Sequence, residues 1–270
     1  MGPATWKIGF SKWIHLDQSV LDRHFAQSML QADIPAVEVG VYGWDRAHFQ
    51  KGAEKAKEII AYYRDNGIRV WSFHLPFGTE IDISHPSFHA SAGALFADMM
   101  EVLAKVSMDK VIIHPSYEPI LDEDRPARLA ICTESLNKLY RPDLKMAVET
   151  LPRTCLCNCA KETLEMLSPL MGKAFVCVDV NHAHKESAPE MLRKVKNHLI
   201  TLHISDDDGL DEKHWYPGAG IRNWEDILDT LAQVGYSGVF MYEVGPSPEA
   251  PELIRDNFDR LLCAYRRQRP

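Results

Sequence analysis

The sequence predicts an α/β fold in which residues 1–270 form a single parallel (β/α)8 barrel. Short apolar runs alternate with longer stretches of helical periodicity through eight strand–helix units, without a composition shift that would mark a linker. Repeating βα units of this number favour a closed parallel barrel. A doubly wound open sheet is the alternative, but it requires a glycine-rich phosphate loop, and GFSKWIHL after the first predicted strand contains no G-x-G-x-x-G.

The predicted strands are short, mostly β-prone apolar runs, as expected for strands that are buried on both faces. In chain order they are Thr5–Phe10, Ala36–Val39, Ile68–His74, Lys110–His114, Leu144–Glu149, Phe175–Asp179, His198–Ser205 and Gly238–Glu243. The first is followed by a predicted loop through Trp13 and His15. A long polar stretch, Asp206–Arg222, follows the seventh and breaks the rhythm of the chain.

The predicted helices carry apolar residues at helical spacing, and several have recognisable ends. In chain order they are Gln18–Ala32, Ala47–Asn66, Phe88–Lys105, Pro126–Tyr140, Lys161–Pro169, Pro189–Asn197, Asn223–Val234 and Pro251–Arg266. Asp17 is a candidate N-cap for the first helix, and Gly67 is a typical stop for the second. Pro189 lies in the first turn of the sixth, where its missing N–H costs nothing.

Composition and charge exclude several classes of protein. Hydrophobic residues make up 46% and charged residues 25% of the chain, as in a globular domain with a sizeable core. The net charge of -8 provides no sequence-wide basic field for nucleic acid or an anionic membrane. No apolar run approaches the ~20 residues that span a bilayer, and MGPATWKIGF lacks the layout of a signal peptide. We therefore expect a cytoplasmic protein with neither a membrane nor a nucleic-acid partner.

Three of the six cysteines form the cluster CLCNC, at Cys155, Cys157 and Cys159. In a chain of this length without a secretion signal, reduced thiols are the expectation. The C-x-C-x-C spacing lacks the C-x₂-C pairs of a structural zinc site, and no second such cluster occurs elsewhere. We therefore expect an ordinary loop at this cluster rather than a metal site or a disulfide.

Six predicted strands end on, or carry near their end, a side chain of a metal-ligand type. These side chains are His74, His114, Glu149, Asp179, His203 and Glu243. In a parallel barrel the carboxyl ends of the strands share one face, so the six are expected to converge there. A single histidine of this kind is usually a hydrogen-bonded core residue. Three carboxylates and three imidazoles together require a counter-cation in a low-dielectric funnel, and a divalent metal ion supplies it.

Mixed carboxylate and imidazole ligands suit Mn²⁺ or Zn²⁺, and also Co²⁺, Fe²⁺ or Mg²⁺. His182, His214 and Glu212 join these candidates because of their neighbours in the sequence. His182, in DVNH, is close enough to Asp179 to face the same mouth, and His214 lies in the loop DEKHWYPGAG near Glu212 and Asp206. Glu38, in the middle of the second strand, is expected to pair with a buried lysine or arginine.

The motifs HLPFG, IIHPS, AVETLPR, CVDVNHA, LHISD, HWYPGAG and MYEV together resemble the xylose isomerase-like superfamily of TIM barrels, over nearly the whole chain. This superfamily holds sugar and sugar phosphate isomerases and epimerases, and the endonuclease IV type of apurinic endonuclease. In the epimerase branch the resemblance implies one Mn²⁺-like ion held by Glu149, Asp179, His203 and Glu243. It also implies that the two glutamates are the acid/base pair and that His182 contacts the substrate.

In the endonuclease branch the resemblance implies a cluster of three zinc ions. Its ligand pattern falls on His74, His114, Glu149, Asp179, His182, His203, Glu212, His214 and Glu243, with Glu212 in place of the expected aspartate. The acidic balance and the absence of basic loops for a phosphate backbone argue against this branch.

The sequence thus favours a metal-dependent sugar or sugar phosphate isomerase or epimerase that moves a proton next to a carbonyl. A zinc-dependent endonuclease and a non-catalytic metal-binding protein are the alternatives. Trp13, Phe77 and Trp215 are candidate apolar walls for a small sugar substrate. The formation of a homo-oligomer stays open, as do the sugar, the metal and the choice between proton transfer and a hydride shift.

Overall fold

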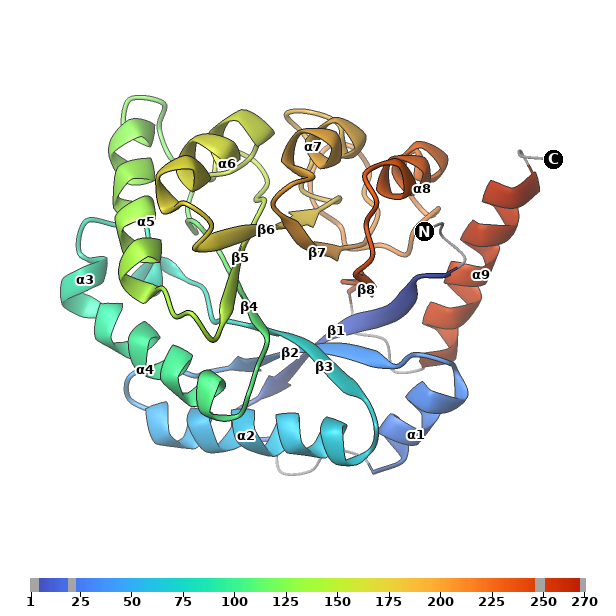
Figure 1. Ribbon diagram of the computed structural model, residues 1–270, viewed down its shortest axis with the longest axis horizontal. Helices are drawn as coiled ribbons and strands as arrows, with labels where there is room; N and C mark the ends of the chain where they lie inside the picture. The colour runs from blue at the N-terminus through green and yellow to red at the C-terminus, as the bar shows by residue number, and fades with distance from the viewer. Residues whose placement is uncertain (1–4, 19–22, 246–250, 268–270) are drawn as a thin grey trace.

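The computed structural model describes residues 5–18, 23–245 and 251–267, which form a ring of strands surrounded by helices (Figure 1). The strands are β1 (Lys7–His15), β2 (Ala36–Tyr42), β3 (Arg69–His74), β4 (Lys110–Ile113), β5 (Lys145–Glu149), β6 (Ala174–Asp179), β7 (Leu199–His203) and β8 (Val239–Tyr242). The α-helices are α1 (Arg23–Gln31), α2 (Phe49–Asp65), α3 (Phe88–Ser91), α4 (Gly93–Lys105), α5 (Arg125–Leu139), α6 (Ala160–Leu167), α7 (Ala188–Val195), α8 (Trp224–Gln233) and α9 (Pro251–Arg267). Two 3₁₀ turns, η2 (Thr79–Ile81) and η3 (Ser168–Leu170), complete these elements.

The eight strands form one parallel sheet in the order β7-β6-β5-β4-β3-β2-β1-β8. Its two edges meet just beyond β7, where the Ile204 amide donates to the Met241 carbonyl at 2.8 Å and the Glu243 amide donates to the Ile204 carbonyl at 3.0 Å. A parallel bridge between Ile204 and Tyr242 completes the nearly closed ring. The predicted (β/α)8 barrel is therefore confirmed, and the doubly wound sheet is wrong.

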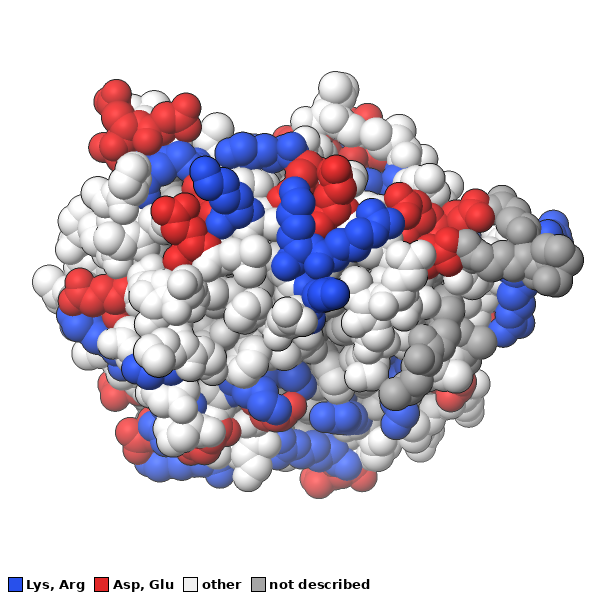
Figure 2. Space-filling model, turned by 45° about the horizontal axis from the view of Figure 1, so that its top comes forward, with Lys and Arg blue, Asp and Glu red and all other residues white. Residues whose placement is uncertain are grey.

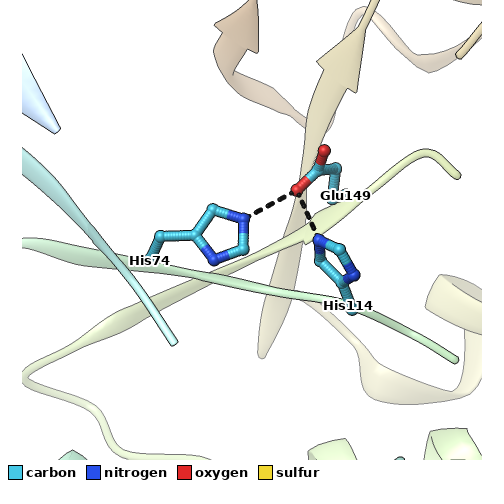
Figure 3. A group of neighbouring side chains, drawn as sticks. All are labelled: His74, His114 and Glu149. Carbon is cyan, nitrogen blue, oxygen red and sulfur yellow. Dashed lines mark hydrogen bonds and ion pairs between the residues drawn. The ribbon is translucent and has the colours of Figure 1, made fainter. Parts of the chain in front are cut away.

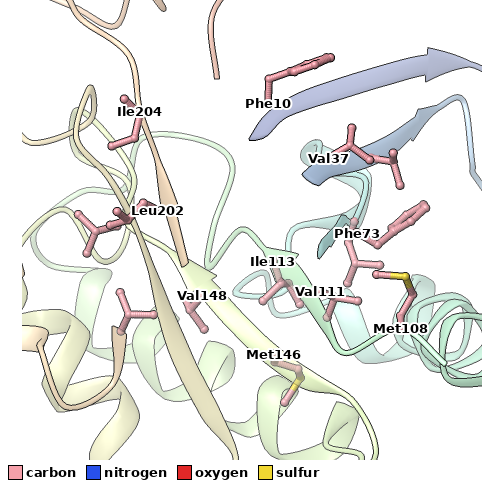
Figure 4. Packing of buried hydrophobic residues seen from close by; sticks show 14 of the residues in the cluster. Phe10, Val37, Phe73, Met108, Val111, Ile113, Met146, Val148, Leu202 and Ile204 are labelled. Carbon is pink, nitrogen blue, oxygen red and sulfur yellow. The ribbon is translucent and has the colours of Figure 1, made fainter. Parts of the chain in front are cut away.

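Side chains along the strands alternate between the helix layer and the barrel interior. On β5, Met146 and Val148 join the large core under the helices (Figure 4). Ala147, between them, joins the interior cluster with Ile112 and Cys177. Because successive strand residues point to opposite faces, Glu149 follows Ala147 into the interior. The same alternation turns the last residues of β6 and β7 inward, which is how the sequence directs its polar strand ends to one site.

β1 and β2 extend several residues beyond their predicted ends, and β2 continues to Tyr42 where the sequence predicts an end at Val39. The first was predicted to end at Phe10, with Trp13 and His15 in a loop, but β1 stays paired with β2 up to the contact of His15 with Tyr42. The backbone of β2 supplies a partner for each additional residue, so a polar stretch that looks like a loop is held as strand. This extension brings Trp13 into the sheet beside the mouth of the barrel.

Two helix predictions also change. The stretch Phe88–Lys105 is divided at Ala92 into α3 and α4. Asp17, the predicted N-cap of the first helix, forms an ion pair with Lys51 of α2, and α1 is described from Arg23 onward. The part of the predicted first helix at residues 19–22 lies outside the described residues.

All six cysteine thiols are free, as expected, and CLCNC is a loop before α6.

Within residues 5–18, 23–245 and 251–267, no helix has both the length and the apolar character needed to cross a membrane.

Candidate active site at the carboxyl ends of the strands

The carboxyl ends of the strands surround an open cavity of about 530 Å³. Seven predicted site residues lie in its wall: His74, His114, Glu149, His182, Glu212, His214 and Glu243. Asp179 and His203 are fully buried, and neither is among the residues that line the cavity. The barrel therefore brings the predicted strand-end residues together in two layers, with some facing the cavity and others beneath its floor.

Glu149, at the end of β5, is the centre of this arrangement. Its Oε2 lies 3.1 Å from Nε2 of His74 and 3.2 Å from Nε2 of His114, which come from β3 and the residue after β4 (Figure 3). Its Oε1 lies 3.1 Å from Nδ1 of His203. Each carboxylate oxygen thus has imidazole partners on a different side, which fixes the plane of the carboxylate at the cavity floor.

A group of four possible ligands lies beneath and beside this carboxylate. One ligand atom each from Glu149, Asp179, His203 and Glu243 can be chosen so that all four lie within 4.8 Å of one another. Nδ1 of His203 is central to the group, at 2.9 Å from Oε2 of Glu243 and 3.9 Å from Oδ2 of Asp179. Two further groups, His74 with His114 and Glu149, and His182 with Glu212 and His214, meet the same criterion.

Burial opposes the negative charges of the four-residue group, and the neighbouring imidazoles favour them. Burial raises the pKa of Asp179 to about 6, although His182 acts in the opposite direction. Burial would also raise the pKa of Glu243, but His203 overcomes it and holds that pKa at about 2. The pKa of Glu149 is likewise held well below its usual range, against burial, by His203 and His114. Positive charge is therefore required to keep these carboxylates ionised.

The donors of this group fit a divalent cation. Oδ1 of Asp179 accepts the Asn181 amide at 2.7 Å, whereas Oδ2 is buried without a hydrogen-bond partner and faces the other three ligand atoms. A buried oxygen without a partner is costly unless a cation receives it. Three carboxylates and one imidazole are a suitable donor set for Mn²⁺, Zn²⁺ or a related ion.

The third group of possible ligands combines His182, from the loop after β6, with Glu212 and His214, from the loop between β7 and α8. Nε2 of His182 is 2.9 Å from Oε2 of Glu212, while Nδ1 of His182 lies 2.9 Å from the Thr150 carbonyl. Arg153 holds the other oxygen of Glu212 at 2.9 Å. His214 has a left-handed backbone with φ of 51° and directs its Nδ1 to the Glu243 carbonyl at 3.0 Å.

Asp206, which the sequence places near His214, pairs with other groups. Its fully buried carboxylate accepts the amides of Asp207, Gly218 and Arg222 and the indole N–H of Trp224, at distances from 2.8 to 3.1 Å. These four donors tie both ends of the long loop to one point. Asp206 therefore shapes the loop that carries Glu212 and His214, and it does so from outside the cavity.

The prediction that Glu38 pairs with a buried lysine or arginine was wrong. This fully buried carboxylate pairs with His203, whose Nε2 lies 3.0 Å from Oε1, and not with a lysine or arginine. The hydroxyls of Ser11 and Ser72 donate to its two oxygens at 3.1 and 2.6 Å. Sequence reasoning missed the role of Glu38 behind His203, although its position in an otherwise apolar strand was the signal that could have revealed it.

Trp13 and Phe77 line the cavity as predicted, but Trp215 does not, because its backbone pairs with Asp206 outside the lining. Tyr42 and Tyr117, which the sequence analysis did not single out, line it instead. Gly40 makes room for the Trp13 ring. A Cβ at that position would lie 2.7 Å from the indole, so the glycine lets the ring lie directly against β2.

Comparisons with known proteins agree with this architecture. The family model described as "Xylose isomerase-like TIM barrel" matches residues 27–262. Two uncharacterised proteins of Methanocaldococcus jannaschii are similar in sequence. One is 26% identical over 54% of this chain and 54% of its own length, so the chain spans about half of that relative. The other is 24% identical over 95% of this chain and 99% of its own length.

Solved structures of similar fold cover almost the whole chain. A D-tagatose 3-epimerase-like protein has a TM-score of 0.76 and 19% identity, with 97% of this chain and 99% of that chain covered. A D-psicose 3-epimerase of Clostridium cellulolyticum H10, solved with D-tagatose, has a TM-score of 0.72 and 18% identity, with 97% and 98% covered. An L-ribulose 3-epimerase has a TM-score of 0.72 and 15% identity, with 98% and 97% covered.

Proposed function

The chain belongs to the xylose isomerase-like TIM barrel family, and from this premise we propose that it is a divalent-metal-dependent sugar or sugar phosphate isomerase or epimerase. One observation carries the proposal. Of the four residues that can hold an ion together, Glu149 and Glu243 line the cavity, whereas Asp179 and His203 are buried behind them. Two carboxylates are thus available to a substrate beside a site for a cation, which is the arrangement that proton transfer next to a carbonyl requires.

Glu149, Asp179, His203 and Glu243 are the residues that would hold the ion. A divalent cation bound there would supply positive charge beside the substrate carbonyl, which favours loss of a proton from the neighbouring carbon. Mn²⁺ or Zn²⁺ fits the donors best, and Co²⁺, Fe²⁺ or Mg²⁺ are the other candidates. His182 lines the cavity next to this group, and a substrate hydroxyl that contacts its Nε2 would compete there with Glu212.

The two glutamates carry the proton in this mechanism. One carboxylate removes the proton from the carbon beside the carbonyl, and the other returns one to the neighbouring carbon or to the opposite face. His203 fixes both, at 3.1 Å from Glu149 and 2.9 Å from Glu243. His74 and His114 hold the second oxygen of Glu149, so its carboxylate is oriented before substrate arrives. Such preorganisation lowers the cost of reaching the transition state.

The epimerases with similar structures support the same class of reaction. The D-psicose, L-ribulose and D-tagatose-like 3-epimerases share this fold along almost the full chain. Their identities of 15–19% support the fold more than a particular sugar, so the proposal stops at the class of substrate.

The first test is of the ion. We expect purified protein reconstituted with Mn²⁺, Zn²⁺ or Co²⁺ to retain about one ion at the four-residue group. Asp179→Asn should sharply lower the retained metal, because the buried Oδ2 is replaced or turned away, while circular dichroism shows an intact fold. Protein that retains none of these metals after reconstitution would contradict the proposal.

The second test is of the proton. With the correct sugar in D₂O, turnover should place deuterium on the carbon next to the carbonyl. Glu243→Gln should abolish both exchange and turnover, because an amide can occupy the ligand position but cannot carry the proton. Glu149→Gln should abolish turnover and leave at most partial exchange at one face. Turnover without solvent deuterium would favour a hydride shift between neighbouring carbons and would overturn the proton-transfer mechanism.

The endonuclease alternative has one observation in its favour, namely that three groups of possible ligands, two of which share Glu149, lie around the cavity. Against it, the net charge is -8, and on the face drawn in Figure 2 lysines and arginines are interspersed with acidic side chains. Proteins that grip a phosphate backbone usually present a broad basic surface. We expect no cleavage of duplex DNA containing an abasic site by the zinc-loaded protein, and efficient incision would move the chain to the endonuclease branch.

A further inference from the structure

A continuous row of aromatic rings forms one side of the cavity. Its members are Trp13, Tyr42, Phe77 and Tyr117, which we call the aromatic wall. Ring centroids are 4.7 Å apart between Tyr42 and Trp13, 5.6 Å between Trp13 and Phe77, and 6.0 Å between Phe77 and Tyr117. The four rings come from β1 and β2 and from the loops after β3 and β4, four neighbours in the sheet, so the wall follows one half of the barrel mouth.

Three rings of the aromatic wall are exposed to a degree that the fold does not require. The exposed fractions of Tyr42, Phe77 and Tyr117 are 45%, 40% and 44%. Aromatic side chains gain stability from burial, and contiguous exposed apolar surface on a soluble protein usually marks a binding site. Phe77 is also held flat against His114, with centroids 4.1 Å apart and planes 9° from parallel, so this surface is fixed before any ligand binds.

The opposite side of the cavity is charged. Arg153, Glu212, Lys213 and His214 line it from the loops after β5 and β7, and Glu149 and Glu243 line the cavity next to them. A ligand therefore meets hydrogen-bonding groups on one side and flat apolar surface on the other. The cavity volume of about 530 Å³ lies in the range of roughly 300–1,000 Å³ for ligands of drug size. The same cavity is lined by the two glutamates and by the aromatic wall, so a ligand that carries a second group beside its sugar can contact both.

We propose that the substrate is a glycoside that carries a ketone on its sugar ring, that this ring reaches Glu149 and Glu243, and that its planar, apolar substituent stacks on the aromatic wall. The ring ketone supplies the carbonyl that proton transfer requires, because the glycosidic bond locks the anomeric carbon as an acetal. This inference rests on the proposed function for the place of the sugar, and it adds the chemical class of the group attached to it. Stacking between aromatic rings at these separations is favourable beyond the apolar area it buries. The sugar hydroxyls pair with the charged side, and the substituent covers Phe77 and Tyr117.

The test compares matched ligands for binding, so it does not depend on turnover. Phenyl and methyl β-D-glucosides and β-D-galactosides, which lack the ring ketone and so bind without reacting, are titrated into the Mn²⁺-loaded full chain by calorimetry, with phenol as the ligand that lacks a sugar. We expect the phenyl glycoside of at least one sugar to bind about ten-fold more tightly than its methyl counterpart, and phenol to bind far more weakly.

Variants assign this difference to the aromatic wall. Tyr117→Ala should remove most of the phenyl advantage, and Tyr117→Trp should preserve it because a larger ring offers the same stacking face. Tyr140→Ala is the matched control, since Tyr140 is similarly exposed, at 40%, and does not line the cavity. The Tyr140→Ala substitution should change neither the affinity for the phenyl glycoside nor that for the methyl glycoside. Thermal unfolding of each variant verifies that the comparison is made between folded proteins.

Three results would overturn the inference. The first is equal affinity for the phenyl and methyl glycosides of both sugars. The second is an affinity for phenol equal to that for the phenyl glycosides. The third is tight, Tyr117-dependent binding of adenosine monophosphate by a protein that binds neither kind of glycoside. The proposed function fails separately, by an absence of bound metal or of deuterium exchange. A protein that isomerises free sugars without any phenyl preference would keep that function and lose this inference.

Discussion

Glu38 offers the sharpest test of how the strand ends are organised, because it touches the proposed ion site only through His203. Its Oε1 lies 3.0 Å from Nε2 of His203, and Nδ1 of the same ring faces Glu149, Asp179 and Glu243. A carboxylate behind a ligand histidine fixes the ring and its tautomer and increases its basicity. We expect Glu38→Gln to weaken metal binding while leaving all four ligands in place.

The size of the effect follows from the contacts of the carboxylate. Ser11 and Ser72 donate hydroxyl hydrogens that can rotate, so an amide at this position can keep its oxygen toward His203 and turn its nitrogen toward Ser72. The orientation of the ring is then kept and the negative charge behind it is lost. Loss of such a partner typically costs 10–100-fold in metal affinity. We expect about ten-fold for Glu38→Gln, equivalent to roughly 1.4 kcal/mol, and a larger loss for Glu38→Ala.

Competition with a chelator of known Mn²⁺ affinity gives the dissociation constant, and ¹⁵N spectra of the histidine side chains report the tautomer of His203. Asp82→Asn is the matched control, because Asp82 is also a buried carboxylate but pairs with Arg128 away from the ion site. That variant should lose stability and keep its metal affinity. If folded Glu38→Gln protein binds Mn²⁺ as tightly as the unaltered chain, with the same tautomer at His203, the reasoning about this carboxylate is refuted.

Two further predictions concern the scaffold. Asp206→Asn should destabilise the protein by about 3 kcal/mol, because the amide nitrogen would face two of the four N–H groups that now donate to the carboxylate. Urea denaturation measures this loss, and an unchanged midpoint would contradict the prediction. Gly40→Ala should cost about 1–3 kcal/mol and displace the Trp13 ring, which a Cβ would approach to 2.7 Å. A shift in tryptophan fluorescence together with a lower melting temperature is the expected signature, and a variant as stable as the original, with unchanged fluorescence, would refute the close packing.

The sequence by itself determined the barrel and the direction of its polar strand ends. Apolar runs and helical spacing recurred often enough to specify eight βα units, and a parallel barrel gathers their carboxyl ends whatever the loops do. Because side chains alternate strictly along a strand, a run such as KMAVE carries its glutamate to the same interior face as Ala147. These are local rules, and local rules can be read from the chain.

The tertiary structure alone decided which residues meet across the barrel. Glu38 was visible as a charge in an apolar strand, but its partner His203 is remote in sequence and is set by how β2 and β7 face one another through the interior. The extension of β1 to His15 depended on backbone partners in β2. The burial of Asp206 depended on four N–H donors that the fold of one loop brings together. Such contacts depend on how the elements come together in space, since alternation and periodicity specify the face of a residue and not its partner.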